Sequence, residues 1–259
     1  MGKTTGISWT DKTWNAVIGC SRVSEGCRNC YAAQMAATKF TSFLRNPVWG
    51  RNSPRHITSD NLWKEPLRWA RKARQTGDRV LVFGNSLYDI FEDHPTVNAI
   101  RPKIWDLVDQ TRDAIVWQFC TKRPERIADC LPDTWGNFWK NVWLGTSVES
   151  AVHAERVDHL LSIQADVRFL SVEPALGPVA DSIPLKGIDW VIWGGESGRN
   201  FRPADHQWAR DLLQACRVNE VAFFFKQSSG YRSGMGTTLD GKEYKEFPKP
   251  RSLPQTKSA

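Results

Sequence analysis

The chain of 259 residues carries a formal net charge of +7 at pH 7, and 41% of its residues are hydrophobic. This length and hydrophobic fraction fit one large globular domain, and the positive charge is compatible with an anionic partner such as nucleic acid. No run approaches the ~18 consecutive apolar residues of a membrane span, and residues 1–6 lack the apolar core of a signal peptide, so we expect a cytoplasmic protein.

The first predicted strand covers residues 7–18 and leads into a loop with three closely spaced cysteines. Cys20, Cys27 and Cys30 follow the pattern C-x6-C-x2-C, and a glycine precedes each of the first two. Glycine adopts backbone conformations that other residues avoid, so the loop can bend tightly around a bound group. Three thiolates from one loop can hold a metal or an iron–sulfur cluster and leave one coordination position open. Spacing alone also permits a zinc site whose fourth ligand comes from elsewhere.

The other three cysteines differ from these in their surroundings. Cys120, Cys130 and Cys216 lie in strand-like or helix-like sequence, and we expect them to be buried small hydrophobic residues. Six cysteines in a reducing cytosol do not favour a disulfide framework, so the clustered three are best explained by metal binding.

The segment after the cysteines is helical and basic. Residues 32–43 are rich in alanine and predict a helix, and residues 62–75 predict a second helix with a basic face. Between them lies an irregular basic stretch. The simplest interpretation of the charges from Arg45 to Arg74 is a solvated surface, and contact with phosphates is the alternative.

From residue 79 onward one pattern repeats. A short apolar run, typical of a buried parallel strand, ends in polar residues, and helical segments follow several of the runs. The apolar runs are 79–84, 114–120, 142–145, 167–170, 190–193 and 221–225. The predicted helices are 95–110, 124–131, 151–163 and 207–219.

With the cysteine unit, these runs make about seven strand–helix units, which predicts a partial (β/α) barrel of the TIM type. Functional groups of such barrels lie at the carboxyl ends of several strands, and here successive strands end in polar residues. A doubly wound sheet is the alternative, but it would concentrate function at one switch point. We expect the barrel domain to span residues 1–230. Residues 231–259, rich in Gly, Lys and Pro, should form a C-terminal loop and tail, with a small hairpin turning at Asp240-Gly241.

Charged residues at the strand ends are candidates for binding and catalysis. Lys122, Arg123 and Lys226 supply positive charge for a carboxylate or a phosphate. They could equally form structural ion pairs with Glu149 or Glu173.

A glycine pair follows the strand at 190–193. Gly194-Gly195 permits close approach of the backbone to a ligand, and Glu196 can accept hydrogen bonds from an ammonium group or a ribose hydroxyl. A different interpretation is the metal-binding carboxylate ring of a hydrolase, made by Asp89, Glu149, Glu173 and Glu196. That interpretation leaves the cysteine loop unexplained.

The cysteine loop resembles that of radical S-adenosylmethionine (SAM) enzymes in its order and position. In that superfamily three cysteines hold a [4Fe–4S] cluster, and the open iron chelates the amino and carboxylate groups of SAM. Two features depart from the usual pattern: the first gap is six residues instead of three, and Asn29 stands where an aromatic residue commonly precedes the third cysteine.

The chain is more similar to a smaller, phage-associated, three-cysteine-motif family of radical-SAM-like proteins, distantly related to spore photoproduct lyase. The similarity covers nearly the whole chain to about residue 250. The motifs that carry it are Trp14–Ala32, Cys120–Pro124, Gly145–Glu149, Phe169–Pro174, Gly194–Gly198 and Phe224–Gln227.

The resemblance implies a [4Fe–4S] cluster on Cys20, Cys27 and Cys30, and SAM as second cofactor. Our candidates for binding the cofactors are Tyr31, Asn85, Ser86, Asp89, Ser147, Gly194, Gly195, Glu196 and Ser197. Our candidates for catalysis are Lys122, Glu149, Glu173 and Lys226.

Three functions are compatible with these observations. The first is a radical-SAM-type enzyme that takes electrons from a separate donor and acts on DNA, RNA or a nucleotide, in modification or repair. The second is a zinc- or cluster-stabilised nucleic-acid-binding protein without catalysis. The third is a divalent-metal barrel hydrolase. The sequence does not set the oligomeric state.

Overall fold

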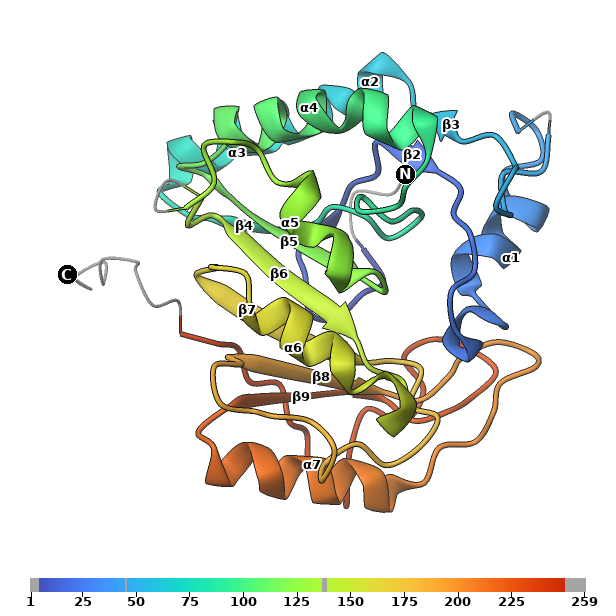
Figure 1. The fold of residues 1–259 in the computed structure, drawn as a ribbon, viewed down its shortest axis with the longest axis vertical. Helices are drawn as coiled ribbons and strands as arrows, with labels where there is room; N and C mark the ends of the chain where they lie inside the picture. Colours follow the sequence, from blue (N-terminus) through green and yellow to red (C-terminus); the bar gives the residue numbers. More distant parts are fainter. Residues whose placement is uncertain (1–4, 45, 137–138, 250–259) are drawn as a thin grey trace.

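A seven-stranded sheet forms the centre of the computed structural model, which describes residues 5–44, 46–136 and 139–249 (Figure 1). Its strands are β1 (Lys12–Thr13), β4 (Val80–Phe83), β5 (Ile115–Thr121), β6 (Val142–Ser147), β7 (Val167–Val172), β8 (Trp190–Gly194) and β9 (Ala222–Gln227). They are hydrogen-bonded in that order, and every pair is parallel. β1 and β9 are the two edges. Consecutive parallel order without a reversal is barrel topology, so the prediction of a partial (β/α) barrel is confirmed.

Helices follow most strands and cover the outer surface of the sheet (Figure 1). They are α1 (Tyr31–Thr38), α2 (Asp60–Trp63), α3 (Glu65–Thr76), α4 (Pro95–Gln110), α5 (Ile127–Cys130), α6 (Glu155–Leu161) and α7 (His206–Val218). Short 3₁₀ turns η1 (Glu25–Cys27), η2 (Pro124–Arg126) and η3 (Ala151–His153) precede α1, α5 and α6. The predicted helix 62–75 is divided in two, because Pro66 has no N–H to continue α2 and lies in the first turn of α3.

The first predicted strand is also divided. Residues 12–13 pair with β4, whereas β2 (Val17–Ile18) pairs with β3 (His56–Ile57) in a separate antiparallel ribbon. The break occurs at Asn15, whose side-chain oxygen accepts a hydrogen bond from the Leu87 backbone N–H at 2.7 Å. The chain therefore leaves the barrel sheet just before the cysteine loop.

The core has an inner and an outer part. Inside the barrel lies an aromatic-rich cluster made by Trp9, Phe83, Val116, Trp143, Val167, Phe169, Trp190, Ile192 and Phe224. A larger cluster fills the space between the outer face and the helices. The two clusters arise because successive residues of a strand face opposite sides, as Val116 and Trp117 do. Large side chains of this cluster fill the barrel interior.

The segment after β9 folds back along the edge of the sheet. Leu239 and Lys242 exchange backbone hydrogen bonds across Asp240-Gly241, whose φ angles of 51° and 76° suit the predicted hairpin turn. Beyond it, the Phe225 N–H donates to the Tyr244 carbonyl at 2.8 Å, which pairs part of the exposed edge of β9. The division of the chain at residue 230 stays a prediction, and Arg45 and residues 250–259 lie outside the described residues.

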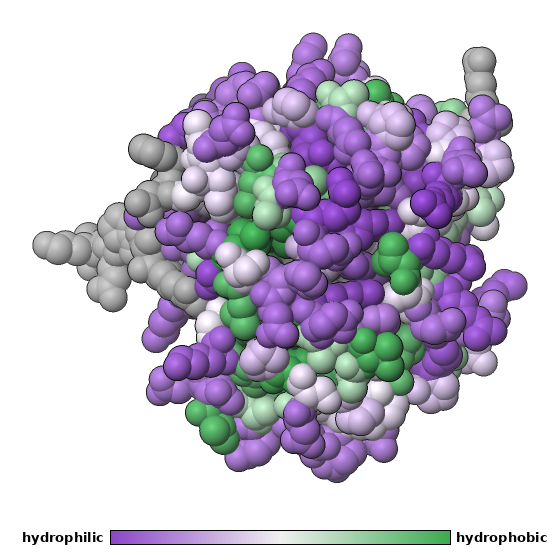
Figure 2. All heavy atoms as spheres, viewed as in Figure 1, coloured by the Kyte–Doolittle hydropathy of each residue, from purple (hydrophilic) through white to green (hydrophobic). Residues whose placement is uncertain are grey.

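The surface seen in Figure 2 is mostly hydrophilic, with hydrophobic residues in small scattered groups. Within the part of the chain that the structure describes, no helix combines the length and apolar character that crossing a membrane requires.

Candidate functional site

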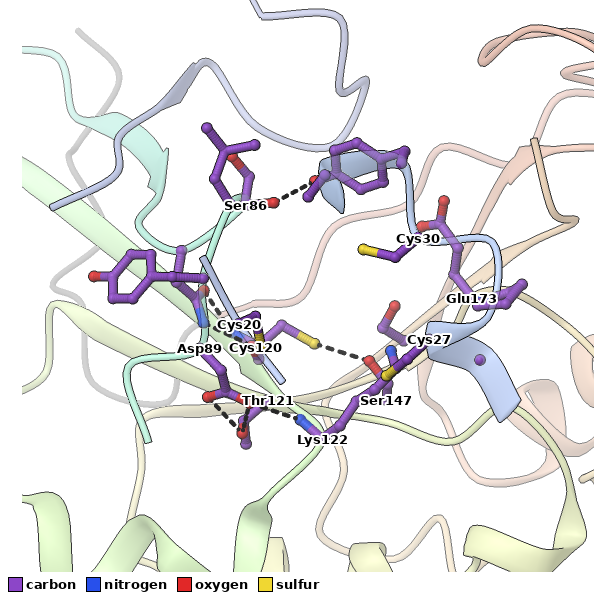
Figure 3. A pocket seen from close by; sticks show the side chains of 18 of the residues that line it. Cys20, Cys27, Cys30, Ser86, Asp89, Cys120, Thr121, Lys122, Ser147 and Glu173 are labelled. Carbon is purple, nitrogen blue, oxygen red and sulfur yellow. Dashed lines mark hydrogen bonds between the residues drawn. The ribbon is translucent and has the colours of Figure 1, made fainter. Parts of the chain in front are cut away.

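A cavity of about 200 Å³ lies at the carboxyl ends of the parallel strands. All three loop cysteines line it, together with residues at the carboxyl ends of β6 and β9 and residues that follow β4, β5, β7 and β8. Figure 3 shows Cys20, Cys27 and Cys30 around this cavity with Asp89, Lys122 and other polar side chains. Of the predicted site residues, only Glu149 and Gly194 do not line it. The fold thus brings to one place residues that are far apart in the sequence.

Cys20 lies beside a guanidinium group. The Nη1 atom of Arg123 is 3.8 Å from the Cys20 sulfur. The pKa of Cys20 is raised to about 12, chiefly by burial; the charges of Asp89 and Glu92 add to the rise, and Arg123 opposes it. Without a metal this thiol is protonated, so a metal that binds here must displace the proton.

The other two cysteines lie close to the start of α1. Burial raises the pKa of Cys30, while backbone N–H groups of Ala33 and Ala32 and the charge of Lys122 oppose the change. Lys122 itself stays charged: burial lowers its pKa, but Glu149, Cys27 and Cys120 raise it above the ordinary value. The cations Arg123 and Lys122 therefore lie where their positive charge would stabilise the thiolate forms of the cysteines.

Three buried carboxylates hold the cysteine loop, and each lies in a segment that follows a different strand. The first is Glu92, in the segment after β4. It accepts hydrogen bonds from the backbone N–H and hydroxyl of Ser21 at 2.8 and 2.6 Å, and from Arg55 at 2.9 Å. Its pKa is lowered, because hydrogen bonds from Arg55 and Ser21 and the charge of Arg123 outweigh the effect of burial. Glu92 thus fixes the residue next to Cys20.

The second carboxylate is Glu149, two residues after β6. Its side chain is fully buried and accepts hydrogen bonds from Ser24 at 2.7 Å and Arg156 at 2.8 Å, with Lys122 at 3.2 Å. A Cβ atom on Gly26 would overlap this carboxylate. Glu149 therefore lies directly under the loop, outside the cavity, and the absence of a side chain at Gly26 makes this contact possible.

The third carboxylate is Glu196, two residues after β8. It accepts hydrogen bonds from the Asn29 side chain at 3.0 Å and from the Arg202 backbone N–H and Nε at 2.8 and 2.9 Å. Arg202 also donates to the Glu25 carbonyl at 3.1 Å. Glu196, a candidate for binding the SAM amino group, is thus already bound by two residues and ties the loop to the barrel. We call Glu92, Glu149 and Glu196 the loop carboxylates.

Residues 4–248 match a family described as "Protein of unknown function (DUF5131)". The chain belongs to this family. No curated protein matches it.

One solved structure is similar to this DUF5131 protein: a spore photoproduct lyase double mutant with bound AdoMet and dinucleoside spore photoproduct. The sequences are 10% identical, and the TM-score is 0.46. The match covers 81% of this chain and 62% of the other, so the chain spans less than two thirds of the length of that enzyme.

Other predicted site residues at the cavity are bound to neighbouring groups of the protein. Lys226 pairs with Glu173, and both line the cavity. Asn85 hydrogen-bonds with the Cys120 carbonyl and N–H at 2.7 and 3.2 Å, joining β4 to β5. Tyr31 donates to the Ser86 carbonyl at 2.8 Å.

The glycine pair packs against protein. A Cβ atom on Gly195 would overlap the backbone and side chain of Ser229, and one on Gly194 would come within 3.3 Å of Glu173. Ser197 bridges to Gly230. These contacts show that the glycines allow the loops after β8 and β9 to lie close together.

Cys120 does not follow the prediction. It lines the cavity, and its sulfur is 3.6 Å from the Ser147 hydroxyl, whereas Cys130 and Cys216 are buried as expected. The reason is alternation along β5: Val116 faces the barrel interior, so Cys120, four residues on, faces the same side at the mouth. Burial raises the pKa of Cys120 to about 11.

The donor set of the cavity suits a group held by thiolates. Among the described residues, no three His, Cys, Asp or Glu side chains are arranged to hold a single metal ion. The three loop thiols instead surround a shared space, with Lys122 and Arg123 positioned to offset thiolate charge. This chemistry fits an iron–sulfur cluster, which is bound through cysteine thiolates.

The sequence analysis missed the residues that support the site. They are Ser21, Ser24, Asn29, Arg55, Glu92, Arg156 and Arg202. Only Glu92 could have been suspected from the sequence. It directly follows the buried apolar residues Ile90 and Phe91, and an acidic residue is buried in such a place only when it is paired. The others resemble ordinary surface residues in the sequence.

Proposed function

We propose that this DUF5131 protein is an iron–sulfur enzyme of the radical-SAM type. In this proposal Cys20, Cys27 and Cys30 hold a [4Fe–4S] cluster, and SAM occupies the rest of the cavity. The observation that carries the proposal is that the three loop thiols line one cavity at the mouth of a barrel. When bound, the cluster supplies the one-electron reduction of SAM that starts radical chemistry.

The residues of the chain itself have three tasks in this proposal. Lys122 and Arg123 offset the charge of the thiolates. The loop carboxylates hold the cysteines in position, as supporting residues of metal sites do. The aromatic cluster closes the barrel below the cavity and excludes water from that side.

The Lys226–Glu173 pair and Tyr31 also line the cavity, and in this proposal they contact SAM or the substrate. The electron donor is a separate molecule. The net charge of +7 supports a nucleic acid or a nucleotide as the substrate, in modification or repair.

A competing candidate is a structural metal site in a binding protein without catalysis. The observation that favours it is Cys120, a fourth thiol lining the same cavity. Four protein ligands would leave no open position for SAM. The role of Cys120 therefore separates the two functions.

The deciding experiment compares single Cys→Ala variants after anaerobic reconstitution with iron and sulfide. Under our proposal, Cys20→Ala, Cys27→Ala and Cys30→Ala lose the cluster and the cleavage of SAM, because each removes a thiolate ligand. Cys120→Ala should keep the iron and sulfide content of the natural protein. Cys216→Ala, at a buried position away from the cavity, is the control for packing.

Absorbance of the brown protein, iron and sulfide per chain, and SAM cleavage products are the measurements. Loss of metal from Cys120→Ala equal to that from Cys20→Ala would favour the structural site. Purified protein that binds zinc and takes up no iron–sulfur cluster would also overturn the proposal.

A further inference from the structure

The buried cations of the cavity are all paired. Lys122 lies at Glu149, Arg123 at Asp89 and Lys226 at Glu173. On the barrel exterior, Arg74 and Arg217 are similarly occupied by Asp113 and Glu246. The three cations at the strand ends that were first considered for phosphate contact are therefore engaged within the protein.

Five exposed arginines near the cavity in the sequence differ from these paired cations. Within residues 5–44, 46–136 and 139–249, no ion pair or side-chain hydrogen bond involves them, and we call them the rim arginines: Arg22, Arg28, Arg51, Arg199 and Arg232. The first four each lie within two residues of a residue that lines the cavity, namely Ser21, Cys27, Trp49 and Ser197. Arg232 is two residues from Gly230, which bridges to Ser197.

An exposed aromatic ring lies beside one of these arginines in the chain. The Tyr231 side chain is 69% exposed, and its ring meets that of Phe201 edge-to-face at 5.2 Å. Tyr231 is next to Arg232 in the loop after β9, and Phe201 is two residues from Arg199 in the loop after β8. An exposed tyrosine between cations provides a stacking surface for a base.

The loop that carries Tyr231 is firmly held. The buried Gln227 side chain accepts hydrogen bonds from the Gly234 N–H at 2.8 Å and the Ser233 hydroxyl at 3.0 Å, and donates to the Gly195 carbonyl at 2.9 Å. The Gly230 N–H also donates to the Glu196 carbonyl at 3.1 Å. A ligand that stacks on Tyr231 thus meets a preformed surface.

We propose that this rim binds single-stranded nucleic acid, with phosphates on the rim arginines and a base stacked on Tyr231. Unpaired arginines attract a polyanion, and a single strand, unlike a duplex, exposes the base faces that an aromatic ring contacts. The acidic side chains nearest in sequence, Glu25 and Glu196, are both paired with Arg202, at 3.5 and 2.5 Å. Only the delivery of a nucleotide to the cavity for reaction rests on the proposed function; strand binding does not.

The test is fluorescence anisotropy of labelled single-stranded DNA and RNA of about 12 nucleotides, a length that spans several contacts. The variant Arg199→Ala/Arg232→Ala should bind more weakly, and the slope of log K against log salt should fall by about 1.4 when two phosphate contacts are lost. Tyr231→Ala should weaken binding about 5- to 150-fold.

The matched control is Arg71→Ala/Arg79→Ala. These arginines are also exposed and free of ion pairs within the described chain, but Arg71 lies on α3 and Arg79 directly before β4, away from the cavity mouth. This variant should bind as the natural protein does. Equal loss in the control, absence of binding at low salt, duplex binding as tight as single-strand binding, or equal binding of an acidic peptide would overturn the proposal.

Iron and sulfide content, measured in the same variants, separates this proposal from the function proposed above. Both double variants should keep a full cluster. Conversely, cluster-free Cys20→Ala protein should still bind the strand. Protein that holds a cluster but does not bind the strand would contradict only the rim proposal. Protein that binds the strand but takes up no cluster would contradict only the enzyme proposal.

Discussion

At the scale of single residues, the site depends on side chains that hold the cysteine loop. Glu149 lies at a strand end, where barrel enzymes place catalytic groups, yet it is fully buried and is bound by Ser24, Lys122 and Arg156. A carboxylate buried among several partners keeps its charge because those partners replace water. The pKa of Glu149 is accordingly lowered, although burial alone would raise it. Its geometry suits support of the loop.

The substitution Gly26→Ala tests this contact. The added methyl group would overlap the Glu149 carboxylate, which Arg156 and Lys122 hold in place. We expect a loss of roughly 1–3 kcal/mol in unfolding free energy, typical of overpacking, and reduced iron after reconstitution. Thermal unfolding and iron analysis measure both effects.

The control is Gly6→Ala, because a Cβ atom there meets nothing within 4 Å. This variant should unfold and load iron as the natural protein does. Normal iron content in Gly26→Ala would show that the loop tolerates displacement from Glu149.

At the scale of elements, one carboxylate adds side-chain hydrogen bonds to the backbone pairing between β9 and the segment that follows it. Glu246 accepts hydrogen bonds from Arg217 and from the Phe223 backbone N–H, at 2.9 and 3.0 Å. The hydrogen bond from Arg217 is the main cause of the lowered pKa of Glu246, and burial opposes it. The contact joins α7, β9 and the C-terminal segment.

This arrangement predicts a dependence on pH. A carboxyl whose pKa is lower in the folded than in the unfolded chain stabilises the fold above its unfolded pKa, and the contribution is lost as pH falls through the folded pKa. Stability from Glu246 should therefore be fully present near neutral pH, begin to decline below about pH 4.5, and be lost as the pH falls through the lower pKa of the folded state. Glu246→Gln should lower the melting temperature at pH 7 and lose this difference at pH 3.

Hydrogen exchange at the Phe223 and Phe225 amides is the local measurement, since both pair with the segment. Asp78→Asn, at an exposed position without an ion pair among the described residues, controls for removal of one negative charge. A stability difference that persists unchanged at pH 3 would contradict the assignment to Glu246.

At the scale of the whole molecule, the barrel and the cysteine loop depend on different interactions. The interior aromatic cluster contains none of the loop cysteines, and the helices pack on the opposite face of the sheet. The loop is attached by hydrogen bonds to the loop carboxylates, and Cys30 packs against a small apolar cluster that includes Ile18 and Leu87. We therefore expect the barrel to fold without a cluster.

Removal of the cluster from reconstituted protein with a chelator tests this expectation. Far-UV circular dichroism should change little, whereas amides of residues 19–30 should exchange faster. The melting temperature should fall by several degrees, because a group that binds only the folded state stabilises it. Loss of the circular dichroism signal would show that the cluster is needed for the barrel itself.

The amino-acid sequence by itself determined the order of the strands and the position of the cysteine loop. Parallel strands buried on both faces need continuous apolar runs, so their positions are local properties of the chain. The predicted run at 142–145 and helix at 95–110 correspond to β6 and α4. The sequence predicted the surroundings of Cys120 less accurately. Only the orientation of β5 in the folded sheet decides that this side chain faces the cavity.

Only the tertiary structure decided what holds the site together. Ser21 and Glu92 are 71 positions apart, Ser24 and Glu149 are 125 apart, and Asn29 and Glu196 are 167 apart. No sequence period connects such pairs. They meet because curvature of a parallel sheet brings the ends of β4, β6 and β8 around one opening, and that curvature depends on the packing of all seven strands.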